Sequence, residues 1–316
     1  MIYKLKPNRV HRTYLGGKRI DNFCGTSTLE THMPEDWTAS VTTAYDADGN
    51  SEGVGFTLKG KPLTEIVDED YKLLVKLLDS DERLVIQAHP TVPFAKKHLN
   101  SDFGKTECWY FLDCALDAYV LIGFKEGITR SAWEQAFTDQ DIPQLVSMLH
   151  KIPVKSGDFI FVEGGVPHAI GAGCFMVELQ EPSDLMVVAE KTTPSGRIIP
   201  DRRIDMGLSF DKMMDVYDYT PLSFEAAKEK FMPKSRKLSK GVTEILGAAI
   251  TDKFKMLRCD GNCRADNIGK YAVAICINGS GSINGTKINR GDRLLIKDET
   301  TLLFCDNKNL SVIICY

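Results

Sequence analysis

Short apolar runs separated by glycine turns recur along the whole chain, and they constrain its fold more than any other feature. One phrase occurs in both halves: a Gly-Asp turn followed directly by an apolar, strand-like run. It reads SGDFIFV at 156–162 and RGDRLLI at 290–296. Many short strands joined by glycine turns are typical of β-sandwiches and barrels. The repeated phrase therefore predicts two β modules within one chain.

The chain length and the helical segments indicate how this β framework is divided into domains. The chain has 316 residues, which fits about two domains of ordinary size. We place the boundary in the basic stretch near 230–240, so that the first domain is 1–235 and the second is 236–316. Helical patterns concentrate at about 68–151, which predicts a helical insertion in the first domain. The expected fold class is mainly β with inserted helices, built from two β jelly rolls.

Local patterns predict individual elements. Acidic residues open the segment 68–79 and its apolar residues recur at helical spacing, so we expect a short amphipathic helix there. Thr129 or Ser131, and Asp139 or Asp141, are suitable N-caps for two helical pieces within 129–151. Further expected elements are helical turns at 93–99, a helix and basic linker at 222–241, an irregular stretch at 205–220, a turn at 46–50, and strands at 83–88, at 107–123, from 154 onwards and through 242–316.

The composition excludes several classes of protein. Hydrophobic residues make up 43% of the chain and charged residues 26%, as in ordinary soluble proteins. The net charge is −4, so the basic footprint of a nucleic-acid-binding protein is missing. No run approaches the ~20 apolar residues of a membrane span, and no secretion signal is recognisable. We expect a cytoplasmic protein that binds a small molecule, not nucleic acid or a membrane, and whose oligomeric state cannot be read from the sequence.

The cysteines favour the same compartment. There are nine of them at irregular spacing, which argues against a disulfide framework. Several lie in apolar runs, such as Cys276 between two isoleucines, and we interpret them as buried, reduced thiols. Cys259 and Cys263 could form half of a zinc site, but no second half follows.

Three segments carry side chains that can bind a metal. In the first, Gln87 and His89 are two residues apart, so a strand would point both to one face. In the second, Lys105 and Glu107 share a face in the same way. In the third, a glycine, an apolar strand and a Gly-Gly turn precede His168, a pattern that resembles the second signature of cupin jelly rolls.

Together these segments offer a donor set for one metal ion, formed by Gln87, His89, Glu107 and His168. Two imidazoles, a carboxylate and an amide oxygen suit Zn²⁺ and leave room for water or substrate. One carboxylate against a divalent ion leaves the site positively charged, which would stabilise a developing oxyanion. We expect one Zn²⁺ per chain, although imidazole ligands also permit Fe²⁺, Mn²⁺ or Co²⁺.

The same segments resemble a known family. QAHP at 87–90, GKTECWY at 104–110 and GDFIFVEGGVPHAIGAG at 157–173 are similar to the three metal-site phrases of the type I mannose-6-phosphate isomerases, or phosphomannose isomerases, of the cupin superfamily. PEDW at 34–37 and LGG at 15–17 are similar to two phrases found early in that family. All of these phrases occur in the family's order.

This resemblance implies a fold, a reaction and a set of site residues. The fold would be two cupin jelly rolls with a helical part. Because the chain has no histidine after His168, we expect the C-terminal jelly roll to hold no His-type metal site. The reaction would be a zinc-dependent interconversion of mannose 6-phosphate and fructose 6-phosphate, by proton transfer through a cis-enediol. The implied catalytic residues are Lys105, Glu178 and Asp184, and we add Trp37, Lys105 and Arg197 as candidate substrate contacts.

Two positions depart from the family pattern. Members carry an Arg, often argued to be catalytic, four residues after the Asp that corresponds to Asp184. Many also carry a Ser or Thr, used for phosphate, two residues before the Gln that corresponds to Gln87. Here these positions are Val188 and Val85, and a valine cannot make a charge-assisted hydrogen bond to phosphate. The alternatives that stay open are an isomerase of an unphosphorylated or different sugar, a non-catalytic sugar-binding cupin, and a metal cupin oxygenase or epimerase. Cations that could replace the missing charge are Arg12, Lys18, Arg19, Lys191, Arg197, Arg202 and Arg203.

Overall fold

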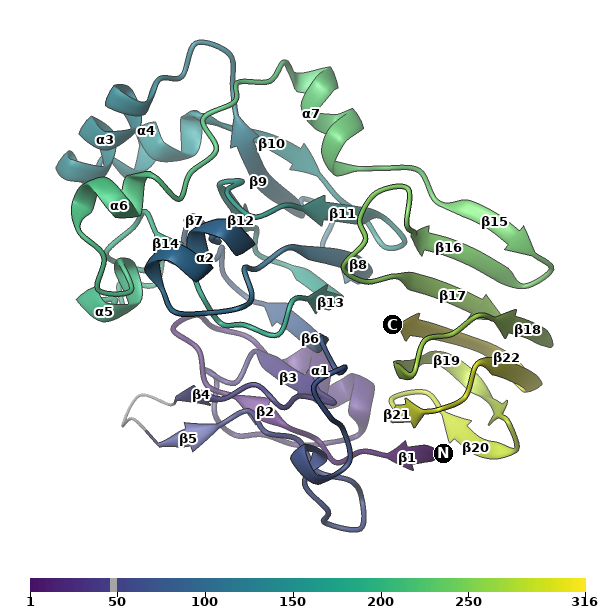
Figure 1. Ribbon diagram of the computed structural model, residues 1–316. Helices are drawn as coiled ribbons and strands as arrows, with labels where there is room; N and C mark the ends of the chain where they lie inside the picture. The colour runs from purple at the N-terminus through teal and green to yellow at the C-terminus, as the bar shows by residue number, and fades with distance from the viewer. Residues whose placement is uncertain (46–49) are drawn as a thin grey trace.

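Three β-sheets and a group of helices make up most of the protein (Figure 1). The structure is a computed structural model that describes residues 1–45 and 50–316. Strands outnumber helices, so the fold is mainly β, as the sequence predicts. The turn predicted at 46–50 falls on residues 46–49, which lie outside the described residues, and it stays a prediction.

The first sheet has five antiparallel strands in the order β10-β9-β12-β7-β14. Its strand β7 is shorter than the run predicted at 83–88, and pairs with β12 on one side and β14 on the other. The strands are β7 (Gln87–Ala88), β9 (Tyr119–Phe124), β10 (Leu149–Pro153), β12 (His168–Ile170) and β14 (Val187–Val188).

Four helices cover the outer face of this five-stranded sheet and share one apolar cluster with it. The side chain of Thr129 accepts the N–H of Ala132 and that of Asp141 accepts the N–H of Gln144, which confirms one cap for each predicted piece. The four helices are α3 (Arg130–Asp139), α4 (Ile142–Ser147), α5 (Asp201–Ile204) and α6 (Phe210–Met214), the last within the stretch predicted to be irregular. Elsewhere lie α1 (Lys18–Cys24), the 3₁₀ helix η1 (Leu63–Glu65), α2 (Val92–His98) and α7 (Phe224–Phe231).

The second sheet has six antiparallel strands in the order β11-β8-β13-β6-β3-β2. It faces the five-stranded sheet, and an apolar cluster that includes Trp109 and Ile122 joins the two. The strands are β2 (Arg9–Val10), β3 (Glu35–Thr38), β6 (Leu74–Ser80), β8 (Glu107–Cys114), β11 (Phe159–Val162) and β13 (Cys174–Gln180). A separate small sheet pairs β4 (Ala44–Tyr45) with β5 (Ser51–Glu52).

The third sheet has nine strands, eight of them from the C-terminal part of the chain. The ninth is the N-terminal strand β1, whose Tyr3 is registered opposite Leu295 of β21. The segment predicted as a basic linker contains the exposed edge strand β15, paired with β16. The strands are β1 (Ile2–Lys4), β15 (Arg236–Ser239), β16 (Val242–Leu246), β17 (Met256–Asp260), β18 (Cys263–Asp266), β19 (Tyr271–Ile283), β20 (Thr286–Asn289), β21 (Arg293–Lys297) and β22 (Thr301–Cys315).

The helix predicted over 68–79 is wrong, because the segment ends in strand β6, Leu74–Ser80. Every residue of β6 is buried, since both faces of the six-stranded sheet are covered. A strand buried on both faces reads as a continuous apolar run rather than as an alternation. At this length such a run also fits helical spacing, so the periodicity could not separate the two structures.

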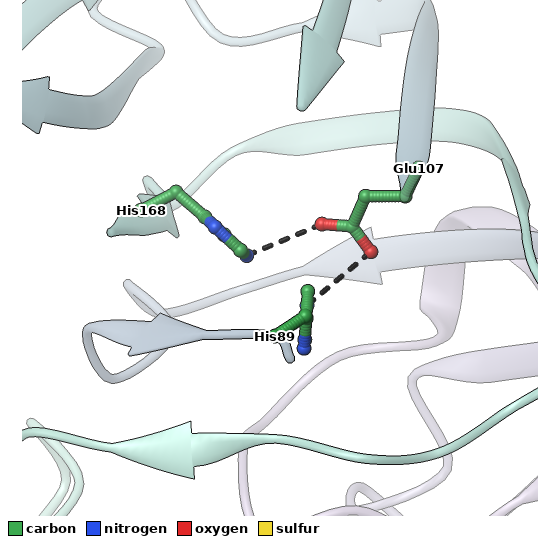
Figure 2. Close-up of side chains that lie close together, drawn as sticks. All are labelled: His89, Glu107 and His168. Carbon is green, nitrogen blue, oxygen red and sulfur yellow. Dashed lines mark ion pairs between the residues drawn. The ribbon is translucent and has the colours of Figure 1, made fainter. Parts of the chain in front are cut away.

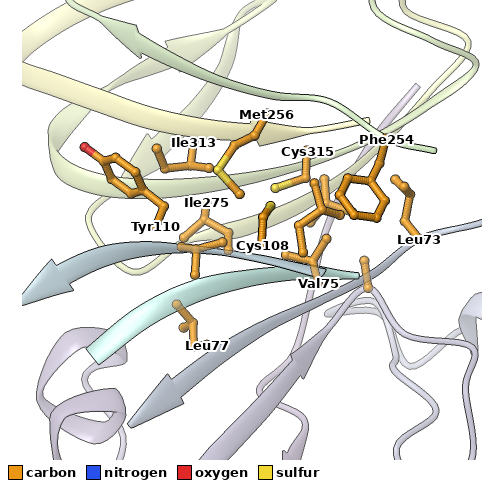
Figure 3. Close-up of a cluster of buried hydrophobic side chains, with 14 of the residues drawn as sticks. Leu73, Val75, Leu77, Cys108, Tyr110, Phe254, Met256, Ile275, Ile313 and Cys315 are labelled. Carbon is orange, nitrogen blue, oxygen red and sulfur yellow. The ribbon is translucent and has the colours of Figure 1, made fainter. Parts of the chain in front are cut away.

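A shared apolar core joins the six-stranded and nine-stranded sheets (Figure 3). Val75 and Leu77 of β6 and Cys108 of β8 enter it from one sheet, and Ile275 and Ile313 enter it from the other. The opposite face of the six-stranded sheet is thereby free to carry polar side chains toward the five-stranded sheet. Five of the nine cysteines are buried, whereas Cys305 is exposed. None of the helices among the described residues has the length and apolar character needed to cross a lipid bilayer.

We predict that a buried ion pair at this junction contributes strongly to stability. The Arg293 guanidinium of β21 donates to Oδ2 of Asp36 on β3 at 2.9 Å, and the two side chains are 6% and 0% exposed. Arg293→Leu leaves the Asp36 carboxylate buried without its cation, which should cost about 3–5 kcal/mol in urea unfolding. Arg264→Leu is the matched control, because its ion pair with Asp266 is exposed and should contribute little to stability. Equal losses in the two variants would contradict this role for the buried pair.

Candidate active site and metal centre

The three sequence phrases meet between the five-stranded and six-stranded sheets. His168 lies on β12 and His89 directly follows β7, both in the five-stranded sheet. Glu107 begins β8 of the six-stranded sheet. The two facing sheets therefore supply polar side chains to one site from opposite sides (Figure 2).

Backbone hydrogen bonds hold these phrases together. The N–H of Gly165 donates to the carbonyl of His89 at 2.7 Å, and the N–H of Lys105 donates to the carbonyl of Pro90 at 3.0 Å. A Cβ at Gly104 would lie 2.5 Å from that Pro90 oxygen, so only glycine allows the two segments to approach this closely. This approach brings the GKTE phrase against the end of the QAHP phrase.

His89, Glu107 and His168 turn their polar atoms toward one another (Figure 2). Nε2 of His89 is 3.4 Å from Oε2 of Glu107, and Nε2 of His168 is 3.2 Å from Oε1 of the same carboxylate. One donor atom from each side chain lies within 4.8 Å of the others, and none of the side chains is more than 1% exposed. Two nitrogens and one carboxylate oxygen, gathered this closely, fit a divalent metal such as Zn²⁺.

The second ring nitrogen of each histidine, Nδ1, lies within hydrogen-bond distance of a backbone carbonyl. Nδ1 of His89 is 2.8 Å from the carbonyl oxygen of Leu185, and Nδ1 of His168 is 2.9 Å from that of Val166. A carbonyl only accepts, so each Nδ1 donates a proton, and in the neutral ring Nε2 then carries the lone pair that a metal would bind. Histidines that bind metals ordinarily make this second hydrogen bond. Burial, reinforced by the Lys105 ammonium, lowers the pKa of His89 to about 3, so its ring stays neutral, as metal binding requires.

The ammonium group of Lys105 lies among these donor atoms. Its Nζ donates to Oε2 of Glu107 at 2.5 Å and to Nε2 of His89 at 2.7 Å. Burial opposes the charge on Glu107, but the adjacent Lys105 ammonium outweighs burial and holds the pKa of Glu107 well below its usual range. The His89 lone pair can serve either this ammonium or a metal. A metal at the site would therefore release Lys105 from His89.

Gln87 lies beside the three candidate ligands, but its amide nitrogen rather than its oxygen faces His168. It is registered opposite His168 of β12 and opposite Val188 of β14. Its amide Nε2 is 3.4 Å from Nε2 of His168. A metal would need the amide oxygen instead, so the role of Gln87 as a fourth ligand stays a prediction.

A row of cross-strand neighbours forms the floor of the adjoining cavity. Residues directly opposite one another on antiparallel strands point to the same face of the sheet. The row runs across β8, β13, β6 and β3 through Trp109, Glu178, Lys76 and Trp37. The first three line the cavity, whereas Trp37 is fully buried beneath Lys76 and Arg12.

Glu178 is a buried carboxyl whose charge is only partly compensated. Lys76 approaches its Oε1 at 3.4 Å and Lys105 at 3.7 Å, while the Glu107 carboxylate repels it. Burial is the largest influence, and it raises the pKa of Glu178 to about 7 despite the two lysines. A carboxyl poised near neutrality can both take and return a proton.

Arg12 and Asp184 lie together on the wall of the same cavity. Arg12 contacts Oε2 of Glu35 through Nε at 3.0 Å and Oδ1 of Asp184 through Nη2 at 3.2 Å. Its guanidinium also lies over the Trp37 ring, 4.7 Å from the ring centroid. Burial alone would lower the pKa of Arg12, but these carboxylates raise it, so the group stays charged. A guanidinium held on three sides is preorganised for binding an anion.

The remaining predicted residues lie further from the metal centre. The backbone N–H of Arg197 donates to the Thr193 hydroxyl at 3.1 Å, which places Arg197 in a turn beside the cavity-lining Thr193. Val85 and Val188, the two departures from the family pattern, both line the cavity and form an apolar part of its wall.

Sequence reasoning missed Lys76 and Glu35 as residues of the cavity. Lys76 lies in the middle of the segment taken as a helix. A lysine in the middle of a fully buried strand is itself a signal, since lysine is rarely buried without a partner.

The fold and the site together define a mainly β protein with a buried His-Glu-His centre whose Glu107 lines a charged cavity. No protein-family model matches the chain. The chain is 33% identical over 180 residues to the probable mannose-6-phosphate isomerase GmuF of Bacillus subtilis, a match that covers 54% of this chain and 55% of that protein. The match thus spans about half the length of this curated relative.

Solved structures share the fold over the whole chain. The crystal structure of the mannose 6-phosphate isomerase from Bacillus subtilis has a TM-score of 0.79 at 21% identity and covers 100% of this chain and 99% of its own. A structure described as holo, zinc-bound mannose 6-phosphate isomerase has a TM-score of 0.71 at 14% identity, with 100% and 99% covered. The chain therefore resembles the mannose-6-phosphate isomerases in sequence and in fold, as its sequence phrases predicted.

We predict that His89 and His168 are both required for metal binding. Zinc-equilibrated protein should retain one ion per chain after dialysis, whereas His89→Ala and His168→Ala should lose it. Removing a residue that only orients a ligand already costs about 10–100-fold in metal affinity, so loss of a ligand should cost more. Elemental analysis measures the bound zinc. His98→Ala, which alters a histidine on α2 outside the centre, should keep it, and retention by the other two variants would refute the assignment.

We predict that Glu178 titrates near pH 7 in metal-free protein. Protein labelled with ¹³C-glutamate should show one carboxyl resonance with a midpoint near pH 7, far above the ordinary value of about 4.3. Glu178→Gln should remove this titration, and Glu163→Gln, which alters a surface carboxylate, should leave it in place. A set of carboxyl resonances that all titrate below about pH 5 would contradict the raised pKa.

Proposed function

We propose that the protein is a zinc-dependent aldose–ketose isomerase that interconverts mannose 6-phosphate and fructose 6-phosphate. One observation carries this proposal: a buried His-Glu-His centre opens into a cavity that also holds a carboxyl poised near neutrality. The names of the relatives and structural neighbours support the same reaction.

In this proposal His89, Glu107 and His168 hold the metal, and Gln87 completes the set. When bound, the metal would supply a Lewis acid that stabilises negative charge on the sugar oxygens. The fixed Nδ1 hydrogen bonds keep both Nε2 atoms directed at this position, so the site needs no reorganisation of its imidazoles.

Glu178 is the proposed base of the reaction. It would take the proton from C2 of the aldose as O1 gains a proton from the acid that transfers the hydroxyl proton, giving a cis-enediol. It would then return its proton to C1 as O2 gives its proton back to that acid and a carbonyl forms at C2. Its pKa near 7 suits both transfers at neutral pH. Lys105 would donate to a sugar oxygen once released from His89, and Lys76 would hold the Glu178 carboxylate in place. We retain Asp184 as the group that assists transfer of the hydroxyl proton.

Several further predictions belong to this proposal. The chain would comprise two cupin-type jelly rolls, with domains 1–235 and 236–316, although strand β1 pairs within the C-terminal sheet. Arg197 stays a predicted substrate contact, whereas Trp37 is fully buried and would support Arg12 and Lys76 rather than touch the substrate. A cytoplasmic location and the lack of nucleic-acid or membrane partners stay predictions.

One observation favours a second candidate. The apolar wall formed by Val85 and Val188 could suit an unphosphorylated or different sugar, or a sugar that is bound without turnover. Comparing mannose with mannose 6-phosphate as substrates and ligands separates these alternatives from the main proposal.

The proposal is tested by a coupled assay for fructose 6-phosphate formed from mannose 6-phosphate. Activity should disappear with chelator and return with Zn²⁺. Lys105→Met should keep zinc but lose activity by about 100-fold or more, since general acid–base and charge-stabilising groups contribute on that order. Lys96→Met, on the exposed surface of α2, serves as the control. A zinc-loaded protein with intact fold that does not isomerise mannose 6-phosphate would refute the proposal.

A further inference from the structure

The cavity beside the metal centre is lined by charged side chains of both signs. Its lining includes four basic side chains, Arg12, Lys76, Lys105 and Arg203, and four acidic ones, Glu35, Glu107, Glu178 and Asp184. A divalent metal at the His-Glu-His centre would therefore leave the cavity with an excess of positive charge. Such an excess complements a phosphate dianion better than a neutral sugar.

Position 188 does not supply the cation that resembling sequences carry there. Val188 is registered opposite Gln87, so its side chain belongs to the wall beside the metal centre. A cation that could substitute for it comes from α5, the short helix that follows β14 in the chain. Ile204 of α5 is buried in the same apolar cluster as Val187 and Val188, which fixes the helix against the wall.

This anchoring places Arg203 in the lining of the cavity, close to Asp184 and Arg12. Arg203 is half-buried, whereas its neighbour Arg202 is exposed. Burial lowers the pKa of Arg203, and the positive charge of Arg12 acts in the same direction while Asp184 opposes it. Two guanidinium groups that repel each other across one carboxylate would both be stabilised by a bound dianion. Guanidinium groups also match the geometry of phosphate oxygens.

We propose that Arg203, together with Arg12, forms the anion subsite of this cavity and selects a sugar that carries a phosphate monoester. Arg203 thereby replaces the cation that position 188 lacks. The identity of the sugar in this inference rests on the proposed function, whereas the binding of an anion does not depend on it. Arg12 is the fixed half of the subsite, held by Glu35, Asp184 and the Trp37 ring. Arg203 is the half contributed by α5.

The subsite is tested first by binding, without turnover. Calorimetry on the zinc-loaded protein compares glucitol 6-phosphate with glucitol, neither of which can be isomerised. The wild-type protein should bind the phosphate much more tightly. Arg203→Leu should reduce this preference by about 10- to 100-fold, as expected for loss of a charged hydrogen-bond donor. Arg203→Lys should restore part of it, and Arg202→Leu should leave it unchanged.

The same variants are then compared as enzymes. Arg203→Leu should lower kcat/KM for mannose 6-phosphate by a similar factor, with little change in the low kcat/KM for mannose. If the wild-type protein isomerises neither sugar but binds glucitol 6-phosphate through Arg203, the proposed function fails and the subsite stands. If Arg203→Leu folds normally and keeps the full preference for phosphate, or if the wild-type protein has no such preference, the subsite is refuted.

Discussion

The two-sided burial of the six-stranded sheet is the constraint on which the rest of the structure depends. Val75, Leu77 and Cys108 enter the core shared with the nine-stranded sheet, so alternate residues on the same strands must face the five-stranded sheet. Those residues include Glu107, Lys76 and Glu178, all fully or nearly fully buried. Burying charges costs free energy unless each has a partner. Lys76 and Lys105 contact these carboxylates, and a metal at the His-Glu-His cluster would balance the charge further.

The sequence could predict the His-Glu-His cluster because local features define it. A Gln-x-His pair, a Lys-x-Glu pair and a glycine-bounded turn before His168 each depend on the alternation of a single strand, and the facing sheets bring them together. The capped helix pieces after Thr129 and Asp141 were predictable for the same reason. The segment containing Lys76 was misjudged, because a strand buried on both faces loses its alternation of apolar and polar residues.

Sequence patterns could not predict which arginines line the cavity. Arg12 and Arg203 are 191 residues apart in the printed chain and are joined only by the packing of α5 against the wall. Neither lies in a phrase whose spacing marks it as a cavity residue, so several cations remained equal candidates. The structure separates them, since Arg12 and Arg203 line the cavity while Arg202 is exposed. Local motifs therefore predict the His-Glu-His cluster, whereas the positions of Arg12 and Arg203 depend on tertiary packing.

The most direct test of this account is X-ray absorption at the zinc edge of the metal-loaded protein. The account predicts a first shell of nitrogen and oxygen only, at about 2.0–2.2 Å, with the outer-shell scattering of two imidazoles. These would be the rings of His89 and His168, with Glu107 supplying oxygen. A sulfur shell near about 2.3 Å would place the metal at cysteines instead. That result, or a spectrum without imidazole scattering, would contradict the proposed centre.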